Sequence, residues 1–322
     1  MASSISIGGK HARSQVEAQL TKSQRDIGGG IFNTALLIGL AIAIISLVAV
    51  LWTVLADGTG LLAERGTDFL GSTQRTRASE FGIFDGLRGT FWIGMFVVVF
   101  AYPLGIGAAI YLEEYATDNR LTRLIELNIR NLAGVPSVVY GVLGFSIYVS
   151  LFGGFFPGDR FGGETTAAAG ATLATLVLPI VIITSQEAVR AVPQGLREAG
   201  YGVGATKWEV TRHHVLPYAA PGILTGTLLS LARALGEAAP LIIIGGVFGG
   251  SIGPRSGFLN LSQLGEEFTA MPLLITQLAK QPASVSTWTE TTAAAILVLL
   301  AIVILANMLA ILLRNRFETK RG

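Results

Sequence analysis

Long apolar runs separated by polar segments dominate the pattern of this chain. About 20 predominantly apolar residues are enough to cross a bilayer as an α-helix. Six runs come close to or exceed that length: residues 31–55, 88–112, 134–152, 166–186, 218–247 and 291–313. The pattern therefore predicts an all-α membrane protein with six transmembrane helices over 31–313. The polar arm over 1–30 is expected to be flexible, and 314–322 forms a short tail.

Two of the runs carry residues that favour close packing against other helices. The fourth run is rich in Ala and Thr and contains Pro179, so we expect it to be buried among helices rather than to face lipid. In the third run, Tyr140, Gly141 and Gly144 suit a closely packed helix interface.

The connections between the runs differ in pattern. Residues 56–85 mix acidic and basic side chains and are expected to form a solvated loop. Residues 120–132 have apolar positions at helical spacing, which predicts a surface helix, whether or not it lies on the membrane. In 248–290, a Gly-rich start precedes the moderately apolar piece Phe268–Ala279, which Pro272 is expected to break.

Composition supports the membrane assignment and narrows the chemistry. The chain is 51% hydrophobic and 14% charged, with mean hydropathy +0.59, whereas about a quarter of the residues of a soluble domain are charged. It contains no cysteine, which excludes disulfides, thiolate metal sites and cysteine nucleophiles. No basic and aromatic run indicates nucleic-acid binding. The first apolar run is too long for a secretory signal, so it is interpreted as a retained span.

Charge predicts the orientation in the membrane. If residues 1–30 lie inside, the four inside segments carry 4, 3, 4 and 4 Lys and Arg residues, and the three outside segments carry 3, 1 and 2. The positive-inside rule therefore places both termini in the cytoplasm. The polar connection 187–217 is then cytoplasmic.

Two charges inside the fifth run are candidate functional residues. Arg233 and Glu237 are four residues apart, so they would share one helix face and reach each other. A charge inside the membrane is costly and is tolerated where it is paired or lines a wet path. Arg233 could bind an oxyanion and Glu237 neutralise it when the path is empty; alternatively, the pair only fastens the helix to a neighbour. Arg88 is interpreted as an interfacial anchor.

The connection from Glu198 to Pro217 has a distinctive pattern. Small residues, among them Ala199, Gly200 and Gly204, precede a basic stretch that ends in Leu216-Pro217. We expect a short helix, a turn at Gly204 and a second helix that stops near Pro217. It is either a knob for a partner's socket or an ordinary charged loop.

No catalytic or metal-binding constellation is present in the sequence. His11, His213 and His214 lack the spacing of a metal site, and no serine elbow, zinc-protease motif or phosphate loop occurs. Glu113 and Glu114 are interpreted as groups that solvate or cap the end of the second span. The chain is therefore not expected to be an enzyme or to hold a cofactor or metal.

The Glu198–Pro217 stretch resembles the EAA loop of ABC importer permeases. Glu198-Ala199-Gly200, Gly204 and Leu216-Pro217 match its pattern, while Gly200 replaces an Ala and His214 an Ile. Gly at 200 should loosen the first helix by up to ~1 kcal/mol. The resemblance implies the type I ABC importer permease fold, with this loop as the coupling helix that docks on an ATP-hydrolysing subunit.

Three further stretches are similar to phosphate importer permeases of the Pst system: Gly105–Ala116, Leu124–Gly141 and Leu231–Pro240. Phe268–Ile275 and the ending after Trp288 resemble the PstA rather than the PstC type. The similarity implies a multi-pass protein of the bacterial cytoplasmic membrane that forms half of a phosphate path. It also implies a PstC-like second permease, two PstB-like ATPase subunits holding ATP and magnesium, and an extracytoplasmic PstS-like phosphate-binding protein. Arg233 and Glu237 would then meet the anion.

Three alternatives remain at the level of the sequence. The chain could be the PstC-type partner, or a permease for another oxyanion such as sulfate or molybdate. It could report phosphate status as a signalling component. A membrane enzyme or channel working alone is disfavoured, because no catalytic constellation is present.

Overall fold

The computed structural model describes residues 27–155, 164–246, 258–282 and 285–318 of the chain. The described residues contain no strand, and only an isolated antiparallel bridge joins Thr165 to Glu267. The chain divides into two compact units, Met1–Thr53 and Val54–Gly322. Most of the predicted arm, the Gly-rich start of 248–290 and the last four residues lie outside the described residues.

The prediction of six spans is confirmed. Among the described residues, six helical stretches are long and apolar enough to cross a membrane: Gly28–Gly71, Phe84–Tyr115, Ser137–Gly154, Thr166–Arg190, Lys207–Gly236 and Ser286–Leu312. Each contains most of one predicted apolar run. The fold is therefore an all-α membrane protein.

Helix α2 (Ile27–Gly71) holds the described part of the first unit and continues into the second. In the first unit, residues 28–53 are exposed. The predicted solvated loop over 56–85 is wrong for residues 56–71, which are helical with a kink at Arg65 (φ −130°, ψ 16°). Leu61 and Phe69 lie on either side of the kink, and both are buried with Phe81 and Ile83 in one apolar cluster. This burial, which the surrounding charges obscure in the sequence, explains the longer helix.

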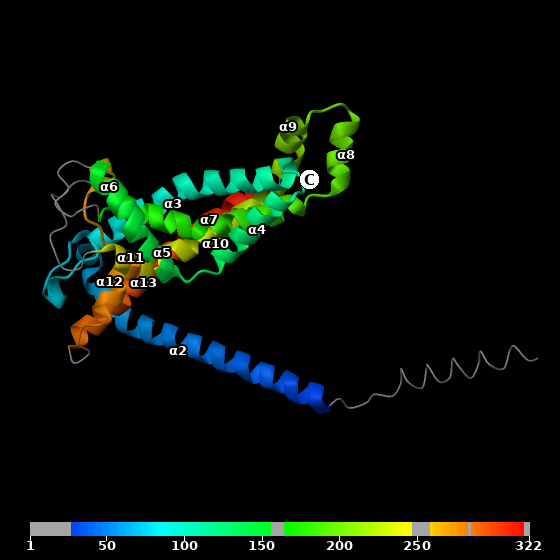
Figure 1. The fold of residues 1–322 in the computed structure, drawn as a ribbon. Coiled ribbons are helices and arrows are strands. Elements are labelled where there is room, and N and C mark those ends of the chain that lie inside the picture. Colours follow the sequence, from blue (N-terminus) through cyan, green and yellow to red (C-terminus); the bar gives the residue numbers. More distant parts are fainter. Residues whose placement is uncertain (1–26, 156–163, 247–257, 283–284, 319–322) are drawn as a thin grey trace, which may run out of the picture. The chain divides into compact units, whose positions relative to one another are not determined.

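Helix α7 (Thr166–Arg190) is the central helix of the second unit. In an 18-residue apolar stretch of α7, 78% of the residues are buried, against 33% in the corresponding stretch of Phe84–Tyr115 and 39% in that of Lys207–Gly236. Helix α3 (Phe84–Ile110) and helix α10 (Leu216–Gly236) pack on either side of it (Figure 1). The prediction that this Ala- and Thr-rich span is buried among helices is confirmed.

The third span consists of α5 (Ser137–Gly144), a π-helical turn η3 (Phe145–Val149) and α6 (Ser150–Phe155). A Cβ atom at Gly144 would overlap the Thr172 hydroxyl of α7 and lie 2.7 Å from Cγ2 of the same residue. One at Gly141 would lie 2.8 Å from Pro240 Cα. The predicted close packing at both glycines is therefore confirmed.

The fifth span differs from the continuous run predicted over 218–247. Its helix ends at Gly236, and Glu237 is extended, with φ −80° and ψ 118°. A separate short helix, α11 (Ala239–Ile244), follows and ends at Gly245, whose φ is +98°. Pro240 explains the break, because it has no N–H to donate to the carbonyl of Gly236 in a continuous helix.

The remaining elements include η1 (Ala78–Glu80), η5 (Leu261–Gly265), α12 (Met271–Leu278) and α13 (Ser286–Glu318). Pro272 was predicted to break the apolar piece Phe268–Ala279, and this prediction is wrong. It lies in the first turn of α12, where a missing N–H removes no helical bond. Met271, Leu274 and Leu278 bury one face of α12 against Ala294 and Ala295 of α13.

Candidate coupling surface and substrate-path residues

Two short helices form a hairpin at one end of the second unit: α8 (Gln194–Gly202) and α9 (Lys207–Val210) (Figure 1). The turn between them falls at Gly204, whose φ of +84° is readily available only to glycine. Thr206 then starts α9 with a capping box: its hydroxyl accepts from the N–H of Glu209, and the Glu209 carboxylate accepts from the N–H of Thr206. The predicted short helix and turn at Gly204 are confirmed.

The second helix does not stop near Pro217, so that prediction is wrong. Helix α9 continues through a π-helical turn, η4 (Thr211–Val215), into α10. Pro217 lies in the first turn of α10, directly after η4. The wider turn accommodates the helical bond that the proline cannot make. The hairpin is thus continuous with a transmembrane helix.

Close packing explains why a glycine stands at position 200, which the sequence did not reveal. Its backbone is buried against α9, and a Cβ atom there would lie 2.8 Å from Cγ2 of Val210 and 3.4 Å from Cδ2 of His214. An alanine would therefore press on Val210. The two departures from the family pattern, Gly200 and His214, are neighbours in space.

Three large apolar side chains near the turn of the hairpin are exposed. Val203 is 83% exposed, Trp208 57% and Tyr201 43%, while Glu198 and Ala199 are exposed on α8. Leu216, by contrast, is half-buried against the cluster of Val189, Val210 and Val215. Sequence reasoning singled out Glu198, Ala199, Gly204, Leu216 and Pro217. It missed the exposed Val203 and Trp208, for which the signal was large apolar side chains in a polar segment.

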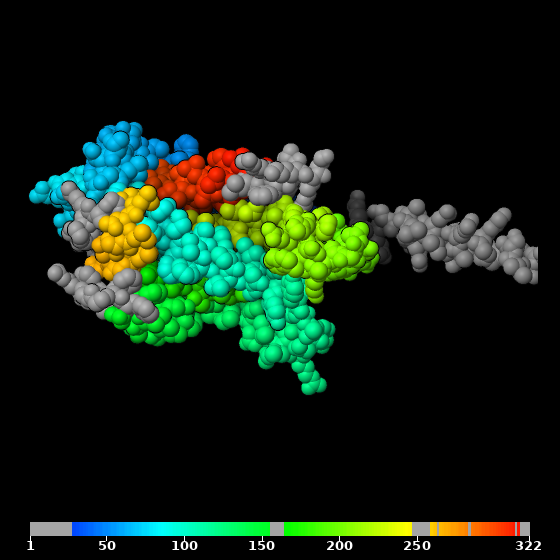
Figure 2. Space-filling view, turned by 90° about the horizontal axis from the view of Figure 1, so that it is seen from above, coloured from blue at the N-terminus to red at the C-terminus, as the bar shows by residue number. Residues whose placement is uncertain are grey.

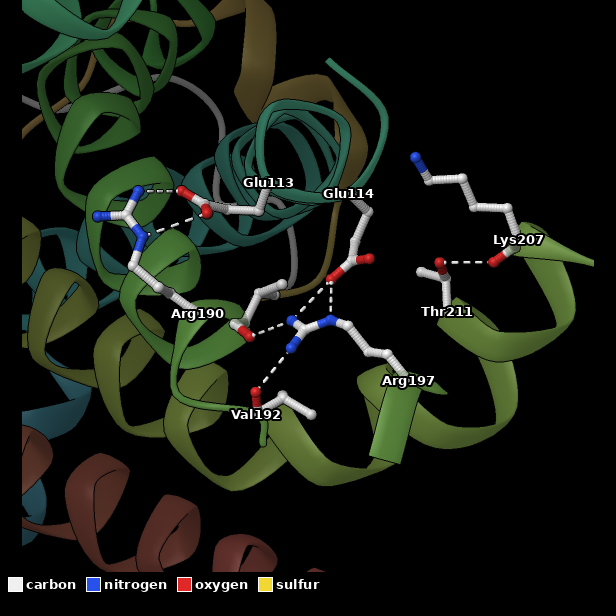
Figure 3. Close-up of polar contacts among 8 residues, drawn as sticks. Glu113, Glu114, Arg190, Val192, Arg197, Lys207 and Thr211 are labelled. Carbon is white, nitrogen blue, oxygen red and sulfur yellow. Dashed lines mark hydrogen bonds and ion pairs between the residues drawn. The ribbon is translucent and has the colours of Figure 1, made fainter. Parts of the chain in front are cut away.

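A buried ion pair fixes the hairpin to two spans (Figure 3). Arg197 of α8 donates from Nη2 to Glu114 Oε1 at 2.9 Å and from Nε to the same oxygen at 3.2 Å. Its Nη1 donates to the carbonyl of Val192 at 2.6 Å, and Nη2 also donates to that of Val189 at 2.9 Å. The side chains of Arg197 and Glu114 are only 14% and 5% exposed. Four hydrogen bonds thus hold one guanidinium.

Glu114 belongs to η2 (Tyr111–Tyr115), a π-helical turn that continues α3. The same turn contacts α9, because Lys207 Nζ lies 5.3 Å from the centroid of the Tyr115 ring. Next to it, Glu113 accepts two hydrogen bonds from Arg190 at the end of α7 (Figure 3). Glu113 and Glu114 were predicted to solvate or cap the end of the second span. Each instead binds an arginine of another helix, Arg190 and Arg197 respectively.

Arg233 and Glu237 meet as predicted, although not on one helix. Arg233 lies in the last turn of α10 and Glu237 just beyond it, and Arg233 Nε is 3.3 Å from Glu237 Oε1. Arg233 is 51% exposed and Glu237 19%. The negative end of the α10 dipole favours the cation at this position. A role of the pair in a substrate path stays a prediction.

Arg88 is not the interfacial anchor that the sequence suggested. Its side chain is 2% exposed and lies 3.6 Å from the carboxylate of Asp85, which is itself buried. Its guanidinium also lies 5.8 Å from the Phe84 ring centroid. Because Asp85 is one helical turn earlier in α3, the charge is compensated inside the unit rather than at the membrane surface.

The sequence matches a known transporter family over the bundle and hairpin just described. Residues 101–321 match the family model described as "Binding-protein-dependent transport system inner membrane component". The chain belongs to this family. It is accordingly a multi-pass protein of the cytoplasmic membrane and a transport permease.

Individual proteins similar to this chain are also transport permeases. The chain is 34% identical over 254 residues to "Phosphate transport system permease protein PstA 1" of Mycobacterium tuberculosis, which covers 78% of each chain. It is 36% identical to "Phosphate transport system permease protein PstC" of Mesorhizobium japonicum, over 55% of this chain and 59% of the relative.

Two solved structures share the fold. One is a bacterial ABC transporter involved in alginate import, with TM-score 0.59 and 15% identity over 89% of this chain and 97% of the other. The other is the inward-facing methionine transporter MetNI, with TM-score 0.53 and 18% identity over 73% and 94%. At these identities, the structures support the importer permease fold alone.

Proposed function

We infer that this chain is the transmembrane permease subunit of an ATP-driven importer of inorganic phosphate. The family match and the 34% identity to a PstA protein over 78% of the chain carry this inference. The similarity to a PstC protein covers less of the chain, which favours the PstA type. Both types carry phosphate in their names, so the substrate assignment does not depend on the choice between them.

The chain works as one half of a larger assembly. A PstC-like permease supplies the other half of the path, two PstB-like subunits bind and hydrolyse ATP with magnesium, and a PstS-like protein delivers phosphate from outside. Both termini and the hairpin α8–α9 face the cytoplasm, because the hairpin side carries the excess of Lys and Arg. The family's dependence on a binding protein and the similarity to a PstC protein support this composition.

The hairpin is the surface that docks on the ATPase subunit. Tyr201, Val203 and Trp208 are large apolar side chains exposed near its turn, and exposed apolar surface of this kind marks interaction sites. Glu198 and Ala199 are exposed on α8, and Gly204 sets the angle between the helices. The short, capped hairpin gives a partner a fixed shape to bind.

Arg197 transmits the movement of the hairpin to the membrane helices. Its guanidinium joins α8 to Glu114 at the end of α3 and to two carbonyls at the end of α7. Lys207 adds a second contact from α9 to the same π turn. A shift of the docked hairpin would therefore pull on α3 and α7 together, while η4 joins it directly to α10.

Arg233 binds the anion transiently on its way through the membrane. It is half-exposed, always charged, and carries a fork of donors that suits a phosphate oxyanion. Glu237 occupies that fork at 3.3 Å in the anion's absence and competes with phosphate, which prevents tight retention. Because Glu237 lies outside the helix, it can move away from Arg233 without unwinding α10.

Uptake by vesicles that contain the complete complex and the binding protein tests the substrate. We expect ATP-dependent accumulation of labelled phosphate, and none of labelled sulfate at the same concentration. Preferential sulfate or molybdate uptake would overturn the phosphate assignment and leave an importer of another oxyanion. Phosphate uptake without ATP or the ATPase subunits would point to a channel.

A further inference from the structure

Helix α4 (Arg120–Ala133) connects the second and third spans and contains no buried residue. Asn119 starts it, because its side chain accepts a hydrogen bond from the N–H of Thr122 at 2.9 Å. Figure 2 shows this segment, in blue-green, projecting from the rest of the second unit. Only residues 116–119 separate it from the second span and residues 134–136 from the third.

The side of α4 that packs on the protein is not its apolar side. Four positions are half-buried, and their spacing places them on one face: Thr122, Glu126, Ile129 and Ala133. This face packs against α7. Beside it, Arg130 reaches a cavity of about 130 Å³ that it lines with Gln186 and Arg190 of α7. The packed face of α4 therefore combines polar Thr122 and Glu126 with apolar Ile129 and Ala133.

A second face of α4, about a third of a turn around the helix from the packed one, is apolar and open. Leu121, Leu124, Ile125 and Leu132 lie on it, and each is exposed. In a water-soluble protein an amphipathic helix turns its apolar stripe inward. Here the stripe lies outside the packed face, which favours an apolar medium around it.

We propose that this outer face of α4 lies in the interfacial layer of the lipid bilayer. The two adjoining spans hold both ends of α4 close to the membrane, so lipid is the apolar medium within reach. Arg120, at its start, can meet the phosphates of anionic lipids. Arg123 points away from the apolar face and binds Asp118 at 2.7 Å, and this hydrogen bond lowers the pKa of the Asp118 carboxyl.

Asn128 fixes the depth of the helix. It lies in the middle of the apolar face, between Leu124 and Leu132, and its Nδ2 donates to the carbonyl of Leu124 at 2.7 Å. The rest of its amide needs water or lipid headgroups, because an unsatisfied polar group is costly in hydrocarbon. The helix thus rests at the level of the headgroups and does not enter the hydrocarbon centre.

A single fluorescent label tests this placement. The chain has no cysteine, so Leu124→Cys offers one labelling position, and the exposed neighbour Arg123→Cys is the matched control off the apolar face. Each variant is labelled with an environment-sensitive dye and assembled with its partner subunits in vesicles. Quenching is measured with a lipid that carries a nitroxide high in the acyl chain, and with aqueous iodide. Leu121→Cys repeats the test in case one variant fails to assemble.

We expect the nitroxide lipid to quench the label at position 124 about twofold or more strongly than at position 123, and iodide to show the reverse order. A label at 124 that is shielded from both quenchers would mean that a partner protein covers the face. A label at 124 that is open to iodide and unquenched by lipid would place the face in water. Either outcome overturns the proposal, whichever anion the complex transports.

Discussion

Gly204 determines the shape of the candidate coupling surface through a single backbone angle. A φ of +84° is unfavourable for a residue with a Cβ atom, even though no neighbour lies within 4 Å of where that atom would be. The strain of a substitution would therefore be purely conformational. Gly202, two residues earlier, also has open space around it but lies within α8.

We predict that Gly204→Ala destabilises the hairpin by about 1 kcal/mol, whereas Gly202→Ala does not, because alanine favours a helix. The loosened turn should raise the number of ATP molecules hydrolysed per phosphate imported. The measurement is parallel ATPase and uptake assays on both variants in the complete complex. Equal coupling in the two variants would contradict the role of the turn.

At the scale of elements, the sequence predicted the helices well but not the contacts between them. Hydrophobic runs gave all six spans, because a span needs a long apolar stretch whatever surrounds it. The EAA-like pattern gave the turn at Gly204. The extension of α2 to Gly71 was missed, since charged side chains surround the buried Leu61 and Phe69.

Long-range pairs were beyond the reach of sequence patterns. Glu114 and Arg197 are 83 residues apart in the chain, and no spacing rule links them. Arg233 and Glu237 were predicted because they are near in sequence. Gly236 and Pro240 indicated a kink in this span, but not the full break at Glu237. The exposed Val203 and Trp208 had a signal in the sequence, as large apolar side chains in a polar segment, but their exposure depends on the fold.

Two variants can distinguish the contribution of the Arg197–Glu114 ion pair to stability from its contribution to coupling. Arg197→Met leaves the buried carboxylate unpaired, which should cost roughly 3–5 kcal/mol. Adding Glu114→Leu removes that charge and should recover much of the loss in thermal stability. If the pair transmits movement, the double variant will assemble yet still import less phosphate per ATP.

Thermal unfolding and coupled transport assays on the same preparations measure both effects. The exposed pair Arg123–Asp118 is the control, and changing it to Gln and Asn should alter neither quantity appreciably. Wild-type coupling in the double variant of Arg197 and Glu114 would make that pair purely structural.

At the scale of the whole molecule, the docking hairpin and the charged pair belong to opposite ends of one helix. Helix α10 starts from the π turn that continues the hairpin and carries Arg233 in its last turn. Helices α3 and α7, which Arg197 ties to the hairpin, pack against α10 along the way. A movement imposed by the ATPase can thus reach the proposed anion site through one continuous element and two packed neighbours.

The central claim is that phosphate passes Arg233 on a path that ATP drives. The most direct test is labelled-phosphate uptake by vesicles with the complete complex, comparing wild type, Arg233→Ala and the control Arg77→Ala. Arg77 forms an exposed pair with Glu80 at 3.5 Å, which has the same chemistry away from the proposed path. Co-purification of the subunits checks assembly. We expect wild type and Arg77→Ala to accumulate phosphate equally, and Arg233→Ala to assemble but lose at least about 90% of uptake, the loss that ~1.4 kcal/mol of anion binding would cause. Wild-type uptake by Arg233→Ala would contradict the account and leave the Arg233–Glu237 pair a structural contact.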